Sequence, residues 1–333
     1  MGTNGKGSTG RFLASILTQL NANVLHYSSP HIVKFNERIW INGSDVSDKV
    51  LEDAHEKIQR ILDNELLEKL TYFEYTTLLG LFLSDTRDYL VLEAGLGGEF
   101  DATNVVPNDL TIVTTIGLDH QNFLGDTISL IASTKMRSCD TQFILSDQIY
   151  DEVYQVKKDV LSTKREILKK KYILNDESEK LPTYLQNNLQ TALSVLDFLG
   201  FKNFPYTLPK LFGRFERISD NIIIDVGHNP LAAEAIAKEL EKEKKKYILV
   251  YNSYADKDYA DVLTILKPYI SEIQIIECDD LRIVEKRNLI EKIEDLSLMV
   301  NDFDIMHLEK DNHYLVFGSF LVVENFLKGY VKV

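Results

Sequence analysis

The sequence predicts an α/β protein of two domains, each built on a mostly parallel sheet flanked by helices. Short apolar strands alternate with amphipathic helices along all 333 residues, a pattern typical of sheets that helices cover on both faces. The length fits about two domains. A basic connector, LPKLFGRFERISDN, separates two such alternations, so we expect domains at 1–207 and 208–333.

The first domain opens with a Gly-rich loop that leads into a helix, because Phe12, Ile16 and Leu20 recur at helical spacing. A loop carrying Pro30 and Asn36 is expected after the first strand. The remaining expected elements are strands at 23–29, 89–95 and 110–117, helices at 47–63 and 73–84, a Lys-rich solvated helix face over 151–171, a polar connector at 175–182 and a helix that stops at Gly200. The strands at 89–95 and 110–117 are expected to be buried, because their residues are mostly apolar.

The second domain begins with the strand NIIID and repeats the alternation. Pro230 stands at the expected first residue of a helix, a position that proline favours. The other expected elements are helices at 230–243, 259–269 and 285–296, strands at 246–251, 272–277 and 314–318, and a closing helix.

Composition excludes several classes of protein. The formal net charge of −14 disfavours binding to nucleic-acid backbones and to anionic membranes. The two cysteines, Cys139 and Cys278, fit no disulfide framework or zinc spacing and are interpreted as buried thiols. No apolar run reaches the roughly 18 residues of a membrane-spanning helix, and the polar start is no signal peptide. We therefore expect a cytoplasmic, monomeric enzyme that acts on small molecules.

The stretch GTNGKGST at residues 2–9 is suited to bind phosphate. Backbone N–H groups of a Gly-rich loop before a helix bind phosphate without needing a net positive charge. Lys6 adds a point charge, and Ser8 offers a hydroxyl to a magnesium ion. The alternative is a plain glycine turn, because Gly7 interrupts the usual Lys-Ser order of such loops.

Glu93 and His120 both follow the carboxyl end of an apolar strand, which is where ligands bind in open α/β sheets. A carboxylate there is costly unless it is paired or bound to metal; the alternative is that Glu93 caps a tight turn. His120, beside Asp119, is a candidate metal ligand. Lys135, on the following helix, is by its spacing alone a solvated lysine.

Asp225 ends a strand of the second domain, where its carboxylate is placed to accept hydrogen bonds from ribose hydroxyls. The alternative is a turn in which Asn229 caps the helix that starts at Pro230. Arg214, in the connector, either brings a guanidinium to a phosphate or is a surface arginine.

Taken together and in this order, the motifs resemble the folylpolyglutamate synthase/dihydrofolate synthase family of Mur-type ATP-dependent ligases over nearly the whole chain. The resemblance implies a P-loop ATPase-like first domain that binds ATP and folate, and a smaller Rossmann-like ligase domain. The matching segments are GTNGKGS (2–8), SSPHIVKFNERIWING (28–43), FEYTT (73–77), EAGLGGEFDATN (93–104), GLDHQNFLGDTISLIASTK (117–135), GRFE (213–216), DVGHNP (225–230), DKD (256–258) and FGSF (317–320).

The resemblance also implies a reaction. ATP would phosphorylate a carboxylate of dihydropteroate or a folate, and the amine of L-glutamate would attack the acyl phosphate to give an amide, ADP and phosphate. A carboxylate is a poor electrophile and its charge repels the γ-phosphate. Magnesium ions and cationic side chains are therefore expected to screen the charges and hold the reactants in line.

Roles carry over position by position as implications of the resemblance. The residues expected to bind ATP are Gly2, Thr3, Asn4, Gly5, Lys6, Gly7, Ser8, Thr9, Asn188, Arg214, Asp225 and His228. Those expected to hold magnesium are Ser8, Glu93 and His120. The catalytic set is Lys6, His120, Arg214 and Lys135, the last matching a lysine that is often carbamylated in the family. The substrate side would include Ser29, Pro30, Phe73, Glu74, Asp101, Lys257 and Asp258.

The sequence departs from the family pattern in three places. The family has a strand directly before GTNGKGS and a helix before that. Both are missing here, so we expect the sequence to lack the family's N-terminal segment and to leave a hydrophobic slot where a central strand would lie. Glu99 stands where the family usually has arginine, and Met136-Arg137-Ser138 replaces a small, Gly-containing turn.

Three other functions stay open. A nucleotide-binding protein without catalysis would bind ATP but form no amide, and a P-loop kinase would phosphorylate a hydroxyl. Another Mur-type ligase would act on a peptidoglycan precursor, although SSPHIVKFNERI and FEYTT belong to the folate branch. The sequence leaves the choice between dihydropteroate and folate undecided.

Overall fold

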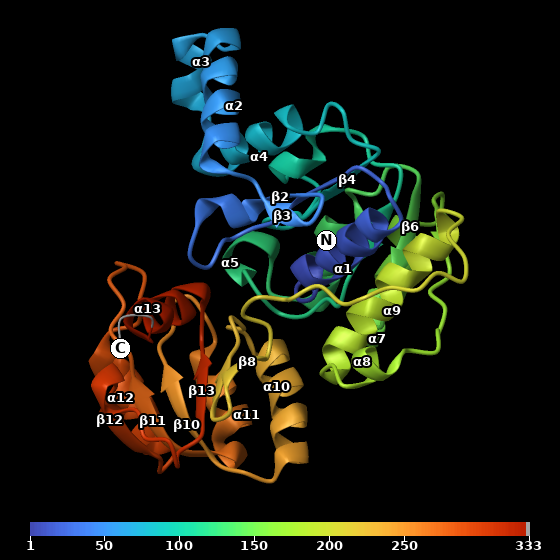
Figure 1. Ribbon diagram of the computed structural model, residues 1–333. Coiled ribbons are helices and arrows are strands. Elements are labelled where there is room, and N and C mark those ends of the chain that lie inside the picture. The colour runs from blue at the N-terminus through green and yellow to red at the C-terminus, as the bar shows by residue number, and fades with distance from the viewer. Residues whose placement is uncertain (331–333) are drawn as a thin grey trace. The chain divides into compact units, whose positions relative to one another are not determined.

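The computed structural model describes residues 1–330, which divide into two compact units (Figure 1). The first unit contains Met1–Gly117 and Gln121–Lys210, and the second contains Leu118–His120 and the chain from Leu211 onward. The segment 118–120 therefore belongs to the second unit, although both its neighbours in the chain belong to the first. The predicted α/β class is confirmed, whereas the separate functions assigned to 1–207 and 208–333 stay predictions.

The strands of the first unit form two sheets rather than one. One sheet is mixed, because β1 pairs in parallel with β4 and antiparallel with β2, which pairs with β3. The other is parallel, in the order β5-β6-β7. Their bounds are β1 (Val24–Tyr27), β2 (Ile39–Ile41), β3 (Ser44–Asp45), β4 (Tyr89–Leu92), β5 (Thr111–Val113), β6 (Gln142–Leu145) and β7 (Arg165–Ile167).

Three local predictions for this unit were wrong. The segment 28–43, expected as a loop, contains β2. The helix face expected over 151–171 ends at Val160 and is followed by β7. The strand β4 was expected to be buried, but all four of its residues are only half-buried, because β4 pairs with β1 alone and forms the edge of its sheet.

The helices of the first unit mostly begin at a short polar side chain, which accepts a hydrogen bond from a backbone N–H of the first turn. The capping residues are Ser47, Asp63, Thr71, Thr127 and Asn175. The helices are α1 (Lys6–Gln19), α2 (Asp48–Ile61), α3 (Asn64–Lys69), α4 (Tyr72–Phe82), α5 (Gln121–Leu124), α6 (Ile128–Met136), α7 (Asp151–Val160), α8 (Asp176–Glu179) and α9 (Thr183–Phe198), with short 3-10 turns η1 (Phe35–Arg38) and η2 (Ala102–Val105).

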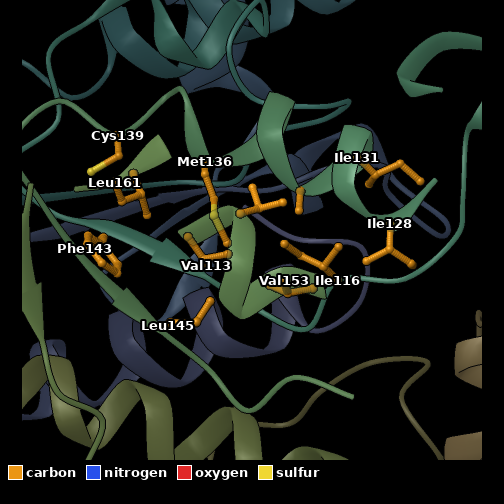
Figure 2. Packing of buried hydrophobic residues seen from close by; sticks show 12 residues of the cluster. Val113, Ile116, Ile128, Ile131, Met136, Cys139, Phe143, Leu145, Val153 and Leu161 are labelled. Carbon is orange, nitrogen blue, oxygen red and sulfur yellow. The ribbon is translucent and has the colours of Figure 1, made fainter. Parts of the chain in front are cut away.

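Each sheet of the first unit has its own apolar core. Around the parallel sheet, side chains of β5 and β6 pack against α6 and α7 (Figure 2). Members of this cluster include Val113, Ile131, Met136, Phe143 and Val153. Around the mixed sheet, β1 and β2 pack against α2 and α4. Burying side chains of this size stabilises each core by about 1.5–3 kcal/mol per residue.

The second unit contains a six-stranded sheet in the order β12-β11-β10-β13-β9-β8, parallel except for β8, which runs antiparallel to β9. Strands β9, β10 and β13 are buried at every position, which explains their continuous apolar runs. The strands are β8 (Glu216–Ser219), β9 (Ile222–Ile224), β10 (Tyr247–Tyr251), β11 (Ile270–Ile275), β12 (Met299–Asp302) and β13 (Tyr314–Phe317).

The helices predicted over 230–243 and 285–296 are reproduced to within one residue, whereas the helix predicted over 259–269 ends at Leu266. The helices of this unit are α10 (Pro230–Glu243), α11 (Tyr259–Leu266), α12 (Lys286–Asp295) and α13 (Phe320–Tyr330), with 3-10 turns η3 (Lys267–Tyr269) and η4 (Ile305–His307). α10 packs on α11, and α13 packs against β13. The strands β8 and β12 were not predicted, because both are short, each has at least two polar side chains, and none of their residues is buried.

Both cysteines are free thiols; Cys139 is buried, as predicted, whereas Cys278 is half-buried. Burial raises the pKa of each thiol. Among the described residues, no helix combines the length and the apolar character needed to cross a membrane.

His26, on β1, is a buried histidine that the sequence did not single out. Its side chain is 1% exposed, and neither ring nitrogen has a hydrogen-bond partner within residues 1–330. The ring lies against α1, where a Cβ on Gly10 would come within 2.5 Å of Nε2. Burial, and then the nearby charge of Arg11, lower the pKa of His26 well below 6.5.

His26 is therefore expected to make the protein sensitive to acid. Below about pH 6.5, His26 binds a proton in the unfolded chain but stays neutral in the folded chain. The free energy of unfolding therefore falls as the pH drops. His26→Leu should reduce this loss by up to about 1.4 kcal/mol per pH unit. Urea unfolding at several pH values would measure it, with His307→Leu, at an exposed histidine, as the control. Equal pH dependence in wild type and His26→Leu would refute the assignment.

Candidate active site

The Gly-rich loop at residues 2–5 is anchored on the segment that follows β5. The backbone N–H groups of Thr3 and Asn4 donate to Thr115 O at 2.9 and 3.1 Å. The Thr3 hydroxyl donates to Gly117 O at 3.0 Å. Gly5 then adopts a left-handed conformation (φ +86°), and α1 begins without a side-chain cap from any described residue. A helix that begins in this way presents backbone N–H groups to an anion.

Two lysine side chains meet at the carbonyl of Gly2. Lys6 Nζ donates to Gly2 O and Thr3 O, both at 3.2 Å, and Lys135 Nζ donates to Gly2 O at 2.9 Å. Lys135 is only 5% exposed, so its interpretation from spacing as a solvated lysine is wrong. The loop therefore gathers two cations that are 129 positions apart in the chain (135 − 6).

A carboxylate and a hydroxyl lie at the first turn of α1. Glu93 is 8% exposed at the end of β4, and a Cβ on Gly7 would lie 3.2 Å from its Oε2. Ser8 Oγ accepts a hydrogen bond from Asn188 Nδ2 at 3.1 Å. Ser29 N donates to Glu93 Oε2 at 3.3 Å, so the loop after β1 reaches the same carboxylate.

This donor set fits a magnesium ion in part. Hydroxyl and carboxylate oxygens are ligands that magnesium prefers, and it usually completes its shell with phosphate oxygens and water. Gly7 leaves the space beside the Glu93 carboxylate that a side chain would fill. Within the described part of the chain, no three His, Cys, Asp or Glu side chains are grouped to hold a metal by themselves.

Two of the predicted substrate-side residues of the first unit, Phe73 and Asp101, have local contacts. The Phe73 ring packs on Gly95, where a Cβ would come within 2.6 Å of it. Asp101 accepts from Leu96 N at 2.8 Å and from the Thr103 hydroxyl at 2.6 Å, so it shapes its own loop. Pro30 is exposed. Whether these residues contact a substrate stays a prediction.

Glu74 caps α4. Its Oε2 accepts from Thr71 N at 2.8 Å and from the Thr71 hydroxyl at 2.7 Å. These hydrogen bonds lower its pKa. The Thr-x-x-Glu spacing of such a capping box is visible in the sequence and could have indicated this role.

Glu99 and Arg137, two residues at which the sequence departs from the family pattern, form an ion pair. Arg137 Nη1 lies 3.1 Å from Glu99 Oε2. Beside this pair, Glu99 N donates to Thr134 O at 3.0 Å, and a Cβ on Gly98 would lie 2.9 Å from Lys135 O. The ion pair therefore joins the loop after β4 to the end of α6, next to the buried Lys135.

Reversing one charge of this pair is expected to destabilise the first unit slightly. Arg137→Glu places two carboxylates side by side, and the side chains are partly exposed, so we expect a loss of about 0.5–1 kcal/mol in the free energy of unfolding. The swap Glu99→Arg/Arg137→Glu should recover most of it. Urea unfolding at low and high salt measures both; a swap as unstable as the single variant would show that the pair does not interact.

In the second unit, Asp225 follows β9 and contacts the turn that carries Arg214. Asp225 is 4% exposed and accepts from Phe215 N and Gly227 N, both at 2.7 Å. The Arg214 guanidinium lies 5.2 Å from the centre of the Phe320 ring and donates to Gly213 O at 3.2 Å. The Asp225 carboxylate thus fixes the backbone that carries the arginine.

Three of the other predicted residues of this unit contact Asp119: His120, His228 and Lys257. Asp119 Oδ1 lies 2.6 Å from Lys257 Nζ and 2.9 Å from His120 N, and Oδ2 lies 3.4 Å from His228 Nε2 and 3.0 Å from Asn229 Nδ2. Burial alone would raise the pKa of Asp119, but the hydrogen bond and charge of His228 and the charges of Lys257 and His120 outweigh it and hold that pKa well below its usual range.

Asp119 was not among the predicted site residues. The only sequence signal was a carboxylate placed directly before His120 at the end of a strand. Asp258, next to Lys257, accepts from Asp261 N at 3.2 Å and caps α11. The structure thus forms two groups: loop residues with Lys135, Glu93, Ser29 and Asn188 in the first unit, and Asp119 with His120, His228 and Lys257 in the second.

Comparison with known proteins first identifies a class. Residues 213–320 match the family described as Mur ligase, glutamate ligase domain, so the second unit is a Mur-ligase-type domain. The chain is 32% identical to the dihydrofolate synthase/folylpolyglutamate synthase of Haemophilus influenzae, over 98% of this chain and 86% of that protein. The chain therefore belongs to the dihydrofolate synthase/folylpolyglutamate synthase family.

Solved structures agree with this assignment. The crystal structure of Helicobacter pylori folylpolyglutamate synthetase is 38% identical, with a TM-score of 0.76, and the match covers 100% of this chain and 88% of that one. The bifunctional folylpolyglutamate synthase/dihydrofolate synthase of Yersinia pestis, complexed with AMPPNP and Mn ion, is 25% identical, with a TM-score of 0.83, over 100% of this chain and 88% of that one.

Proposed function

We propose that this chain is an ATP-dependent acid–amino-acid ligase that joins L-glutamate to a carboxylate of dihydropteroate or a folate. The observation that supports this proposal most strongly is the first turn of α1, where the Glu93 carboxylate lies against Gly7 and Ser8. Beside it, the Gly2 carbonyl of the Gly-rich loop accepts hydrogen bonds from Lys6 and Lys135. This arrangement suits a nucleoside triphosphate. The substrates follow from the family to which the chain belongs.

The reaction has two steps. A carboxylate oxygen of the pterin substrate attacks the γ-phosphorus of ATP, and the bond to the β–γ bridging oxygen breaks, so ADP leaves. The glutamate nitrogen then attacks the carbonyl carbon of the acyl phosphate. Inorganic phosphate leaves with the electrons of the C–O bond, and the nitrogen loses a proton to give the amide.

Named side chains have separate tasks in the first step. The loop amides of residues 2–9 and Lys6 bind the β- and γ-phosphates, and Arg214 stabilises the charge on the γ-phosphate. Asn188, Asp225 and His228 contact the nucleotide. Ser29, Pro30, Phe73, Glu74 and Asp101 form the pterin side, with Lys257 and Asp258 on the glutamate side.

Ser8 and Glu93 would hold one magnesium ion and His120 a second. When bound, magnesium supplies positive charge that screens the repulsion between the substrate carboxylate and the phosphates. As a carbamate, Lys135 would supply a negative charge near the second ion. The enzyme is further proposed to work in the cytoplasm as a monomer.

A glutamate-incorporation assay tests the proposal. Radiolabelled L-glutamate is supplied with ATP, magnesium and either dihydropteroate or tetrahydrofolate, and both amide and ADP are measured. We expect one ADP for each amide formed and no amide without ATP. Nucleotide binding with no amide on either substrate would instead indicate a binding protein without catalysis, and phosphate transfer to a hydroxyl would indicate a kinase.

A further inference from the structure

We propose that Asp119 and Lys257 are positioning residues, whose buried ion pair fixes His120 in the second unit. This inference rests on the proposed function, in which His120 is a metal ligand. It adds a positioning role to the glutamate-side place proposed for Lys257. The inference follows from three features of the group around Asp119.

The first feature is that the Asp119 carboxylate is fully engaged. Among the described residues, Oδ1 lies close to Lys257 Nζ and His120 N, and Oδ2 lies close to His228 Nε2 and Asn229 Nδ2. The side chains of Asp119 and Lys257 are 8% and 7% exposed. A buried ion pair is tolerated only where further hydrogen bonds satisfy its atoms, and here they do so for the carboxylate.

The second feature is the backbone of His120. Its φ of +54° lies in the left-handed region, which residues other than glycine seldom adopt. The His120 N–H donates to Oδ1 of the preceding Asp119 at 2.9 Å. Such a local side-chain-to-backbone bond stabilises a conformation that the backbone would otherwise leave. Lys257 Nζ contacts the same oxygen and so keeps Asp119 in place. The ion pair therefore fixes the direction in which the His120 side chain projects from the backbone.

The third feature is the position in the sequence of the residues that contact Asp119. His228 and Asn229 come from the DVGHNP segment, and Lys257 comes from the DKD segment. Both segments therefore hold residues 118–120, which the chain inserts into the second unit between two parts of the first. Structural contacts to Asp119 account for Lys257 without any contact to glutamate.

Lys257 Nζ also lies 3.5 Å from His120 Nε2. Because of this contact, the direction in which metal affinity changes when Lys257 is removed tests the proposal. If Lys257 positions His120, its removal weakens metal binding. If the ammonium instead competes with a metal ion for Nε2, its removal strengthens metal binding. The two roles predict opposite changes in one measurement.

The test measures Mn²⁺ binding by electron paramagnetic resonance in the presence of AMPPNP, with His120→Ala identifying the Mn²⁺ site that depends on this histidine. Lys257→Met and Asp119→Asn should each lower the Mn²⁺ affinity of that site about tenfold, because the loss of groups that orient a metal ligand commonly has an effect of this size. The double variant should be no weaker than Asp119→Asn alone, because the two residues act as one unit.

A second readout needs no metal. Hydrogen exchange of the peptide that contains residues 118–120 should quicken in both variants, while peptides of β10 and β13 stay protected. Lys257→Gln, which keeps a donor, is a milder variant should Lys257→Met unfold. The matched controls are Lys286→Met and Asp280→Asn, which remove the exposed partner of Asp302 and the half-buried partner of Arg282 in the same unit and should leave both readouts unchanged.

Tighter Mn²⁺ binding in Lys257→Met, or unchanged binding and exchange in both variants, would overturn the proposal. Failure of the proposed function would look different. A wild-type chain that incorporates no glutamate contradicts the ligase, whereas the Mn²⁺ and exchange comparisons still decide whether Asp119 and Lys257 position His120.

Discussion

Replacing Glu93 by glutamine is expected to abolish glutamate incorporation while the chain stays folded. Glutamine keeps the shape of the side chain and can still accept from Ser29 N, but it carries no charge to offset a cation beside Gly7 and Ser8. Loss of a metal-binding carboxylate should lower turnover at least about 100-fold. The assay is ATP-dependent amide formation, with thermal unfolding as the check on the fold.

The control for this variant is Glu65→Gln. Glu65 is exposed and pairs with Lys69 one turn away on α3, so removing its charge should change turnover by less than twofold, an order-of-magnitude bound for an exposed pair. Turnover of Glu93→Gln within a few-fold of wild type would exclude Glu93 from the metal site. The same result would leave the loop and its lysines as the only support for nucleotide binding in the first unit.

Gly5→Ala is expected to weaken nucleotide binding by about 10- to 100-fold. Gly5 has a φ of +86°, and a Cβ there would lie 2.6 Å from Asn188 Oδ1. Alanine in the left-handed region costs about 1–2 kcal/mol. It would also push Asn188 away from the Ser8 hydroxyl, to which Asn188 Nδ2 donates at 3.1 Å. Fluorescence titration with a labelled ATP analogue measures the affinity.

Gly200→Ala separates backbone strain from the collision with Asn188. Gly200 has a φ of +96°, close to that of Gly5, but a Cβ there meets no described atom within 4 Å. It should therefore lower stability by a similar amount and leave nucleotide affinity unchanged. If both variants bind the nucleotide analogue as tightly as wild type, the contact between the loop and Asn188 has no part in binding.

The second unit could be predicted from the sequence in most of its elements. Asn229 and Pro230 mark the start of α10 by capping and by a fixed φ, and the apolar runs of β10 and β13 belong to strands that are buried on both faces. β8 and β12, the two edge strands of this sheet, were missed because edge strands need no continuous apolar run. Their residues are ERIS and MVND, and none of them is buried.

The site was predictable only where local sequence carries the signal. The loop at 2–9 and Glu93 could be found because glycines before a helix, and a carboxylate after an apolar strand, are local patterns. The partners of Asp119 lie 110 and 138 residues away at Asn229 and Lys257, and no spacing in one sequence encodes such a contact. The pairing of Glu99 with Arg137 escaped prediction for the same reason.

The membership of residues 118–120 in the second unit limits how this protein can be dissected. A recombinant fragment that starts at Leu211 would enclose the Lys257 ammonium without its counter-ion, and so would be a poor stand-in for the intact unit. A hybrid that carries the second unit of this chain on the first unit of another protein faces the same constraint. Residues 118–120 have to be transplanted together with Lys257.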